Sequence, residues 1–201
     1  MLQFNIMIRT KGFTLLELLI TMGILAVLAS TVVLVFNPVE YLRQSRDTRR
    51  IGDLDAISKA IDLYTVNKPA ITELGTASVV YLSLPDTSFT CGSYALPPLP
   101  SPWQYRCATS ANLQKVDGTG WLPVNFSSIF SGAPLATLPI DPVNDNVNAQ
   151  YYMFIASGRK YELSSIMESI RYMSGGYADK TSTDNGDDPA RYEMGSNLLL
   201  A

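Results

Sequence analysis

One uninterrupted apolar run, from Phe13 to Phe36, limits what this chain can fold into more than any other feature. As an α-helix the run is expected to be roughly 36 Å long, which is enough to cross the hydrocarbon core of a bilayer. Buried helices of soluble proteins are rarely this long and this apolar. The sequence therefore predicts a membrane-spanning helix over residues 13–36.

The run contains a single charged residue, Glu17. Placing a carboxylate inside a membrane helix costs roughly 2.5 to 3.5 kcal/mol on insertion scales. Ionisable residues in such places are usually paired and functional, which points to a specific partner for Glu17. The alternative is that the carboxylate only occupies the first turn of the helix, where the helix dipole favours a negative charge.

Residues 1–12 precede the apolar run and place Arg9 and Lys11 next to it. A secretory signal peptide has a similar basic start, but its small-residue cleavage site follows the apolar region. Here the small residue, Gly12, comes before the run, and no A-x-A pattern closes the run. The pattern therefore argues against a conventional signal peptide.

The stretch Lys11–Glu17 (KGFTLLE) resembles the processing site of prepilins and pseudopilins, the subunits of type IV pili and type II secretion machines. The resemblance implies that a prepilin peptidase, which is also a methylase, cuts between Gly12 and Phe13 and methylates the new amine of Phe13. Residues 1–12 are then a leader peptide. The resemblance also implies the partners: copies of this chain and related pilins, the membrane, and the pilus assembly platform.

In the mature chain Glu17 lies close to the new α-amine of Phe13. An α-amine is largely protonated at neutral pH, so it is the obvious counter-charge for the carboxylate. The resemblance implies that Glu17 of one subunit holds the amine of its neighbour and sets the axial step of a filament.

Lipid tails are about as apolar as leucine, so the helix can move from bilayer to bundle at little hydrophobic cost. The alternative is a permanent anchor. Small residues that permit close helix approach are Gly23, Ala26, Ala29 and Ser30.

Asn37-Pro38 follows the apolar run. Proline lacks an amide hydrogen and disfavours a helical residue before it, which predicts a kink or a short unwound stretch. The helical pattern then resumes as an amphipathic continuation over residues 37–68 and ends near Asn67. Its apolar stripe, which is expected to pack on a head domain, consists of Ile51, Leu54, Ile57, Ile61 and Tyr64.

The opposite face of this continuation carries the charges, which are Arg43, Arg46, Asp47, Arg49, Arg50, Asp53, Asp55, Lys59 and Asp62. Three i,i+4 pairs are expected along it, and they are Arg43/Asp47, Arg49/Asp53 and Asp55/Lys59.

The arginines follow the apolar run, so a simple positive-inside count opposes a head outside the cytoplasm. We expect them to belong to a folded, partly self-paired helix and take the orientation from the processing motif. The prediction is a single-pass protein of the plasma (inner) membrane with an extracytoplasmic head, which becomes part of a cell-surface filament.

The remainder, residues 69–201, is expected to be a globular α+β head with an acidic C-terminal loop. Strands are predicted over Ser78–Leu84, Tyr151–Ala156 and Lys160–Ser164, with a hairpin turn at Ser157-Gly158. The expected fold is a long N-terminal α-helix, partly transmembrane, packed on a small antiparallel β-sheet. The hairpin and the Leu138–Pro142 segment before it resemble the heads of major pseudopilins and related pilins.

The chain has two cysteines, Cys91 and Cys107. In an exported protein an even, low count suggests one structural disulfide, whereas in a reducing compartment both would stay thiols. The four prolines and the glycine between them predict a loop. Within this loop Trp103 and Tyr105 are expected to cover the core of the head, and an exposed contact surface is the alternative.

Carboxylates gather near the C-terminus, at Asp179, Asp184, Asp187, Asp188 and Glu193. Carboxylates on a glycine-containing loop suit calcium, which prefers oxygen ligands, although the spacing is not that of an EF-hand. Major pseudopilins carry calcium in a C-terminal loop, and this similarity in position makes Asp184, Asp187 and Asp188 the candidate ligands. A solvated acidic loop is the favoured interpretation, and no other cofactor is expected.

The 201-residue chain has no histidine, which excludes a Ser-His-Asp or Cys-His catalytic arrangement. It has no glycine-rich phosphate-binding motif, and its net charge of −3 gives no case for nucleic-acid binding. We therefore expect a non-catalytic structural subunit of a type IV pilus or pseudopilus-like filament. The alternatives are a non-polymerising, membrane-anchored extracellular binding module and a minor tip adhesin.

Overall fold

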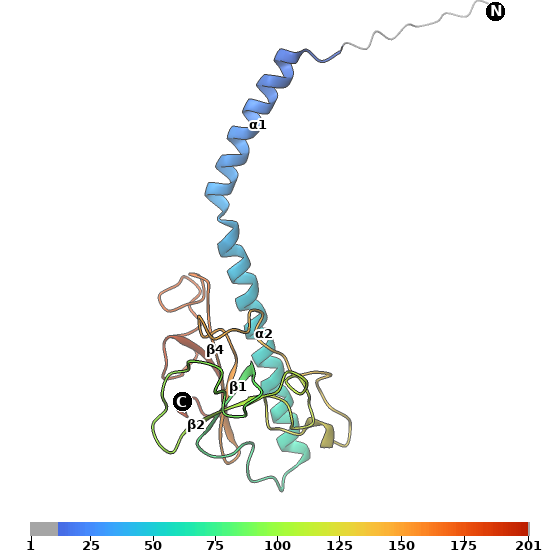
Figure 1. The fold of residues 1–201 in the computed structure, drawn as a ribbon, viewed down its shortest axis with the longest axis vertical. Coiled ribbons are helices and arrows are strands. Elements are labelled where there is room, and N and C mark those ends of the chain that lie inside the picture. Colours follow the sequence, from blue (N-terminus) through green and yellow to red (C-terminus); the bar gives the residue numbers. More distant parts are fainter. Residues whose placement is uncertain (1–11, 201) are drawn as a thin grey trace, which may run out of the picture. The chain divides into compact units, whose positions relative to one another are not determined.

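The structure is a computed structural model that describes residues 12–200, without the side chains of residues 33–36. Residues 1–11 of the predicted leader lie outside this range. The chain divides into two compact units, one ending at Val39 and one beginning at Glu40. The first unit holds the N-terminal helix, and the second holds the β-sheet (Figure 1).

The first unit is built on helix α1, Leu15–Phe36. Among the described residues this is the one helix long and apolar enough to cross a membrane, by length and composition. Its few polar side chains bond back to the helix itself: the hydroxyls of Thr21, Ser30 and Thr31 donate to carbonyl oxygens three or four residues earlier, at 2.7 to 2.9 Å. A helix with such satisfied hydroxyls suits a lipid environment, where an unpaired polar group is costly.

A break in the helical backbone separates α1 from α2, Pro38–Asn67. Asn37 takes a left-handed conformation with φ of 38° and caps the C-terminal end of α1. Pro38 then occupies the first position of α2, where its missing N–H costs nothing. The predicted interruption at Asn37-Pro38 and the predicted end of the second helix are both confirmed.

The second unit contains a five-stranded sheet in the order β2-β1-β3-β4-β5. The strands are β1 Val79–Pro85, β2 Gln104–Ala108, β3 Met153–Ser157, β4 Lys160–Ile166 and β5 Arg191–Gly195. All neighbouring pairs are antiparallel except β1 and β2, which run parallel. The α+β class and the β3–β4 hairpin are confirmed, and Gly158 at the turn has φ of 61°. The sheet is antiparallel as predicted, except at the β2 edge, where β2 runs parallel to β1.

Two of these strands, β2 and β5, were not predicted. The first directly follows the proline-rich loop, and its first three residues lie between the cysteines, in a stretch assigned to loop. The second lies in the acidic C-terminal region and has only five residues, RYEMG. Both pair at an edge of the sheet, so long-range pairing fixes them more than their own composition does.

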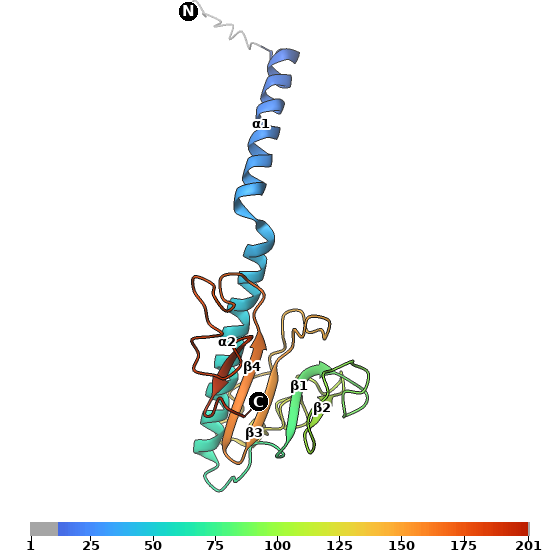
Figure 2. The same cartoon turned by 90° about the vertical axis from the view of Figure 1, so that its left-hand side faces the viewer.

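The main core lies between α2 and one face of the sheet (Figure 2). The predicted stripe faces it: Leu54, Ile57 and Ile61 are fully buried, Tyr64 is buried and Ile51 is partly buried. The connection from β2 to β3, which includes the short 3-10 helix η1 Phe126–Ser128, closes the core with buried apolar side chains. These are Leu113, Trp121, Leu122, Val124, Phe126 and Leu138.

A second apolar cluster covers the other face of the sheet. It contains the disulfide between Cys91 and Cys107, both buried, and apolar side chains of β1 and β3. Trp103 and Tyr105 are half-buried and pack against this cluster. The expectation that these two aromatic residues cover the core of the head is therefore confirmed.

Candidate functional site

The first candidate site is the N-terminal end of α1, where the processing motif meets the helix. Gly12 and Phe13 precede the helix, and the Phe13 side chain is 71% exposed. Thr14 is the N-cap residue, and its Oγ1 accepts a hydrogen bond from the Glu17 backbone N–H at 3.1 Å. The Glu17 carboxylate in turn accepts from the backbone N–H and the hydroxyl of Thr14, at 3.2 Å each.

This reciprocal arrangement is a capping box, which satisfies two otherwise unpaired donors at the start of the helix. Glu17 thus does occupy the first turn of the helix, as the alternative interpretation of its carboxylate requires. Both hydrogen bonds from Thr14 to this carboxylate use Oε2, and Glu17 is exposed, so its carboxylate stays accessible from outside the helix. The cap holds the negative charge within one turn of Phe13.

The surface of α1 is apolar and unburied along the span Leu15–Val32. Leu15, Val27 and Leu19 are each 65% exposed or more, and an added Cβ at Gly23 would meet nothing within 4 Å. An exposed apolar surface of this extent marks a site that contacts lipid or protein. The helix is thus available both to a bilayer and to other helices.

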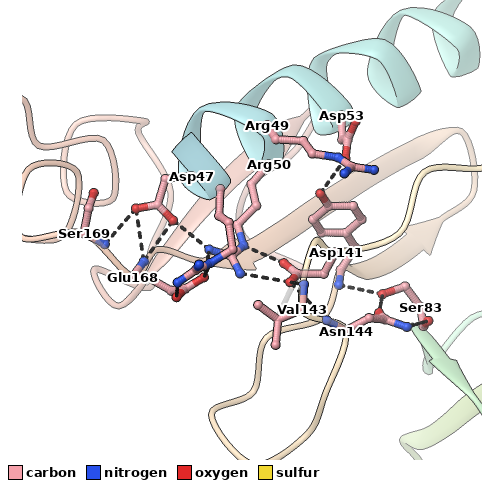
Figure 3. A network of polar contacts seen from close by, with 12 residues as sticks. Asp47, Arg49, Arg50, Asp53, Ser83, Asp141, Val143, Asn144, Glu168 and Ser169 are labelled. Atoms are coloured by element: carbon pink, nitrogen blue, oxygen red, sulfur yellow. Dashed lines mark hydrogen bonds and ion pairs between the residues drawn. The ribbon is translucent and has the colours of Figure 1, made fainter. Parts of the chain in front are cut away.

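The second candidate site is a buried ionic network in the head, centred on Arg50 (Figure 3). The Arg50 side chain is fully buried, and its guanidinium makes a two-pronged contact with Asp141, at 2.5 Å from Nε and 2.9 Å from Nη2. Its Nη1 contacts Asp47 at 2.8 Å and Glu168 at 2.6 Å. Arg46 reaches Glu168 through Nε at 2.9 Å. The network is therefore a set of paired charges rather than a single ion pair.

The carboxylates of this network also accept backbone hydrogen bonds from two distant segments. Asp47 accepts from the N–H groups of Glu168 and Ser169, at 2.8 to 3.1 Å. Asp141 accepts from the N–H groups of Val143 and Asn144, at 2.9 and 3.3 Å. One turn of α2 is thereby tied both to the segment before β3 and to the segment after β4.

The network corrects the charge assignment made for α2. Asp47 and Arg50 were placed on the solvent-facing side, but both are fully buried. The expected Arg43/Asp47 pair is replaced by Arg43–Glu40, at 3.8 Å. The other two expected pairs form: Arg49–Asp53 at 3.6 Å, and Lys59–Asp55 at 2.6 Å.

Burial and pairing oppose each other in setting the pKa values of this network. Burial alone would lower the pKa of Arg50, but its contacts with Asp141, Glu168 and Asp47 outweigh burial and raise it. Burial likewise would raise the pKa of Glu168, but hydrogen bonds from Arg46 and Arg50 hold it at about 2. Arg50 and Glu168 are therefore both charged at neutral pH, which suits a fixed structural link.

The acidic C-terminal loop uses its carboxylates on its own backbone. Asp184 accepts from the N–H groups of Gly186 and Glu193, at 3.0 and 2.7 Å. Asp188 accepts from the Ala190 N–H at 2.9 Å and lies 3.5 Å from Arg191, while Asp187 is exposed. Residues 12–200 contain no group of three or more Asp, Glu, Cys or His side chains arranged to hold a metal ion. A calcium site at Asp184, Asp187 and Asp188 therefore stays a prediction.

A pair of buried carboxyl groups beside this loop was missed in the sequence. Glu162 on β4 and Glu193 on β5 are 1% and 2% exposed, and their carboxyl groups interact electrostatically. Glu162 also accepts from the Leu200 N–H at 2.9 Å, and Glu193 accepts from the Asp188 N–H at 3.3 Å. Burial, together with Glu162 and Asp184, raises the pKa of Glu193 to about 8 despite the Asp188 bond. Alternation along β5 could not have found it, because Tyr192 and Glu193 are adjacent in the strand and both buried.

Replacing Glu193 by glutamine is expected to flatten the pH dependence of stability. Unfolded Glu193 ionises near its ordinary value of 4.5, whereas the folded chain keeps the proton up to about pH 8. The folded state therefore binds more protons in this window, and stability falls as pH rises through it. We expect wild type to lose on the order of 2 kcal/mol more than Glu193→Gln between pH 5 and pH 8.

Chemical denaturation of the full chain in detergent micelles at both pH values measures this difference. Glu73→Gln is the matched control, because Glu73 is exposed and outside the pair. Equal losses in wild type and Glu193→Gln would show that the carboxyl pair does not hold a proton in the fold.

One comparison with known proteins identifies part of the chain. Residues 7–33 match the family model described as the prokaryotic N-terminal methylation motif. This segment includes Gly12, Phe13 and Glu17, the residues singled out at the start of the helix. Neither the curated proteins nor the solved structures gave a match.

Proposed function

We propose that this chain, which carries the N-terminal methylation motif of type IV pilin and pseudopilin precursors, is a structural subunit of a pilus or pseudopilus-like filament. A prepilin peptidase removes the leader after Gly12, and subunits assemble through the helix that begins at Phe13. The observation that carries this proposal is α1: an exposed apolar helix, matched by the motif, with one carboxylate in its first turn. The motif points to a structural role rather than catalysis.

The geometry at the helix start supports a mechanism for assembly. Cleavage converts the Phe13 nitrogen into a charged amine, and the Thr14 cap keeps the Glu17 carboxylate in the same turn. In an apolar bundle such a carboxylate needs a counter-charge, and the amine of an adjoining copy supplies it. Apolar helix surfaces can slide past one another, whereas this charge pair favours one axial register.

Two features of the head support an extracytoplasmic location. The disulfide between Cys91 and Cys107 belongs to an oxidising compartment. Arg43, Arg46, Arg49 and Arg50, which oppose this orientation in a simple charge count, each contact a carboxylate in the structure. A helix folded into a domain in this way is not a short flexible loop, to which the positive-inside rule applies.

Mass spectrometry of the N-terminus in a sheared cell-surface fraction tests the proposal. We expect a mature chain that starts at methylated Phe13 and is found in fibres. Deleting the gene of the prepilin peptidase in the same cells provides the control, and it should leave the full-length chain in the membrane. An intact leader in the wild-type membrane fraction, with no chain in sheared material, would instead support a permanently anchored binding module.

A further inference from the structure

A cavity of about 440 Å³ lies in the head between β1, β2 and the loops that flank β2. Ligand pockets commonly measure about 300 to 1,000 Å³, so this cavity is large enough for a small molecule. Its walls come from Tyr81 of β1, Arg106 of β2, Phe89 in the disulfide loop and the turn that includes Thr119. The cavity belongs to the head alone, and what it binds does not depend on polymerisation.

Arg106 is the one charged residue among those that line the cavity. Its guanidinium carbon lies 5.3 Å from the centre of the Phe89 ring, and Phe89 is 55% exposed. Within residues 12–200 Arg106 is in none of the ion pairs, whereas Arg46 and Arg50 are both held by carboxylates. A guanidinium stacked on a ring keeps its N–H groups in a planar fork that matches a carboxylate. The cavity is thus prepared for one negative charge.

Uncharged polar groups lie around this guanidinium. The Tyr81 hydroxyl oxygen accepts from the Thr76 N–H at 3.0 Å, which leaves its own proton to donate. The Thr119 hydroxyl donates to Asp117 at 2.6 Å, which leaves its lone pairs to accept. The Asn112 amide adds a donor and an acceptor, and Pro123 with Trp121 adds apolar surface. Such a mixture of donors, acceptors and apolar wall matches a polyhydroxylated ring.

We propose that this cavity binds a small acidic sugar, a uronate, with its carboxylate on Arg106 and its hydroxyls on Tyr81, Asn112 and Thr119. A neutral sugar would leave the guanidinium without a partner. A phosphate ester carries more charge than one arginine balances, and the cavity has no second cation. A plain carboxylate such as acetate uses Arg106 but none of the hydroxyl-binding groups.

A titration with sodium glucuronate tests this proposal. The full chain is held in detergent micelles, and binding is measured by saturation-transfer NMR and calorimetry. We expect saturable binding that Arg106→Gln weakens about tenfold or more, because a charge-assisted two-pronged contact is lost. Lys160→Gln is the matched control, since Lys160 is exposed and does not line the cavity. Thermal unfolding of each variant checks that it is folded. Glucose and acetate should each bind about tenfold more weakly than glucuronate.

A trigalacturonate arm distinguishes the two sources of this chemistry. Tighter binding of the trimer identifies a uronate chain as the ligand, and tighter binding of glucuronate identifies the free sugar; either supports the site. The proposal is overturned by the absence of saturable binding, by binding that Arg106→Gln leaves unchanged, or by glucose or acetate binding as tightly as glucuronate.

Discussion

Replacing Arg50 by methionine is expected to lower the free energy of unfolding of the head by about 3 to 5 kcal/mol at neutral pH. The Arg50 side chain is fully buried and holds Asp141, Asp47 and Glu168 at 2.5 to 2.8 Å. Methionine fills much of the same space but leaves two fully buried carboxylates without the cation they face. The cost therefore comes from stranded charges rather than from a cavity.

The neighbouring arginine provides a matched control. Arg49 is 63% exposed and lies 3.6 Å from Asp53, so Arg49→Met should change stability by less than about 0.5 to 1 kcal/mol. Urea unfolding of the full chain in detergent micelles, followed by circular dichroism, measures both variants. A loss in Arg50→Met no larger than that in Arg49→Met would show that the buried network adds nothing to the stability of the head.

Acid should reduce the difference between wild type and Arg50→Met. In wild type the pKa of Glu168 is held at about 2, below its ordinary value of 4.5, because Arg46 and Arg50 outweigh its burial. A carboxyl group whose pKa is lower in the folded state than in the unfolded state stabilises the fold above pH 4.5. This stabilisation is lost as the pH falls toward 2. The variant has less of this effect to lose, so the two stabilities should converge over that interval.

The sequence predicted those parts of the fold that follow from local periodicity or from a special residue. The apolar run gives α1, Pro38 gives the break, and the spacing of Leu54, Ile57 and Ile61 gives the buried face of α2. The alternation around Gly158 gives the β3–β4 hairpin. Each signal lies within a few residues of the feature that it predicts, which is why no tertiary information was needed.

The buried network could not be predicted in this way. Arg50 is 91 residues from Asp141 in sequence, and Asp47 is 121 residues from Glu168. Helical periodicity assigns a charge to the solvent side unless its partner is known, and these partners come from loops that carry no periodic signal. The same reason applies to β2 and β5, which become strands by pairing with distant segments at the sheet edges. The N-terminal site differs because its motif and its cap are both local.

Removing the charge of Glu17 is expected to reduce incorporation of this chain into filaments by more than about tenfold, with leader removal unchanged. The expected loss follows from the cost of a charge without a partner. A carboxylate in an apolar helix is unfavourable by about 2.5 to 3.5 kcal/mol unless a cation offsets it. Without Glu17, the amine of the adjoining copy is the stranded charge. Each 1.4 kcal/mol is a factor of ten in an equilibrium, so such a penalty is measurable in assembled material.

The capping box makes it necessary to separate two roles of Glu17. Its carboxylate accepts two hydrogen bonds from Thr14, and loss of this cap alone would also weaken the start of α1. Glutamine at this position can still cap the helix but has no charge. Thr14→Ala does the reverse, because it removes the cap hydroxyl and keeps the carboxylate. We therefore expect Glu17→Gln to fail in assembly almost as Glu17→Ala does, and Thr14→Ala to assemble with a modest loss.

Immunoblots of sheared and membrane fractions, with mass spectrometry of the N-terminus, measure assembly and processing in the same cells. Processing must be intact in all three variants for the comparison to concern assembly. Normal incorporation of Glu17→Gln beside failure of Thr14→Ala would mean that the carboxylate acts by starting its own helix. The charge pair between subunits would then be wrong, even though the filament itself could remain. Normal incorporation of Glu17→Ala would show that assembly needs neither role of Glu17, because that substitution removes both the cap and the charge.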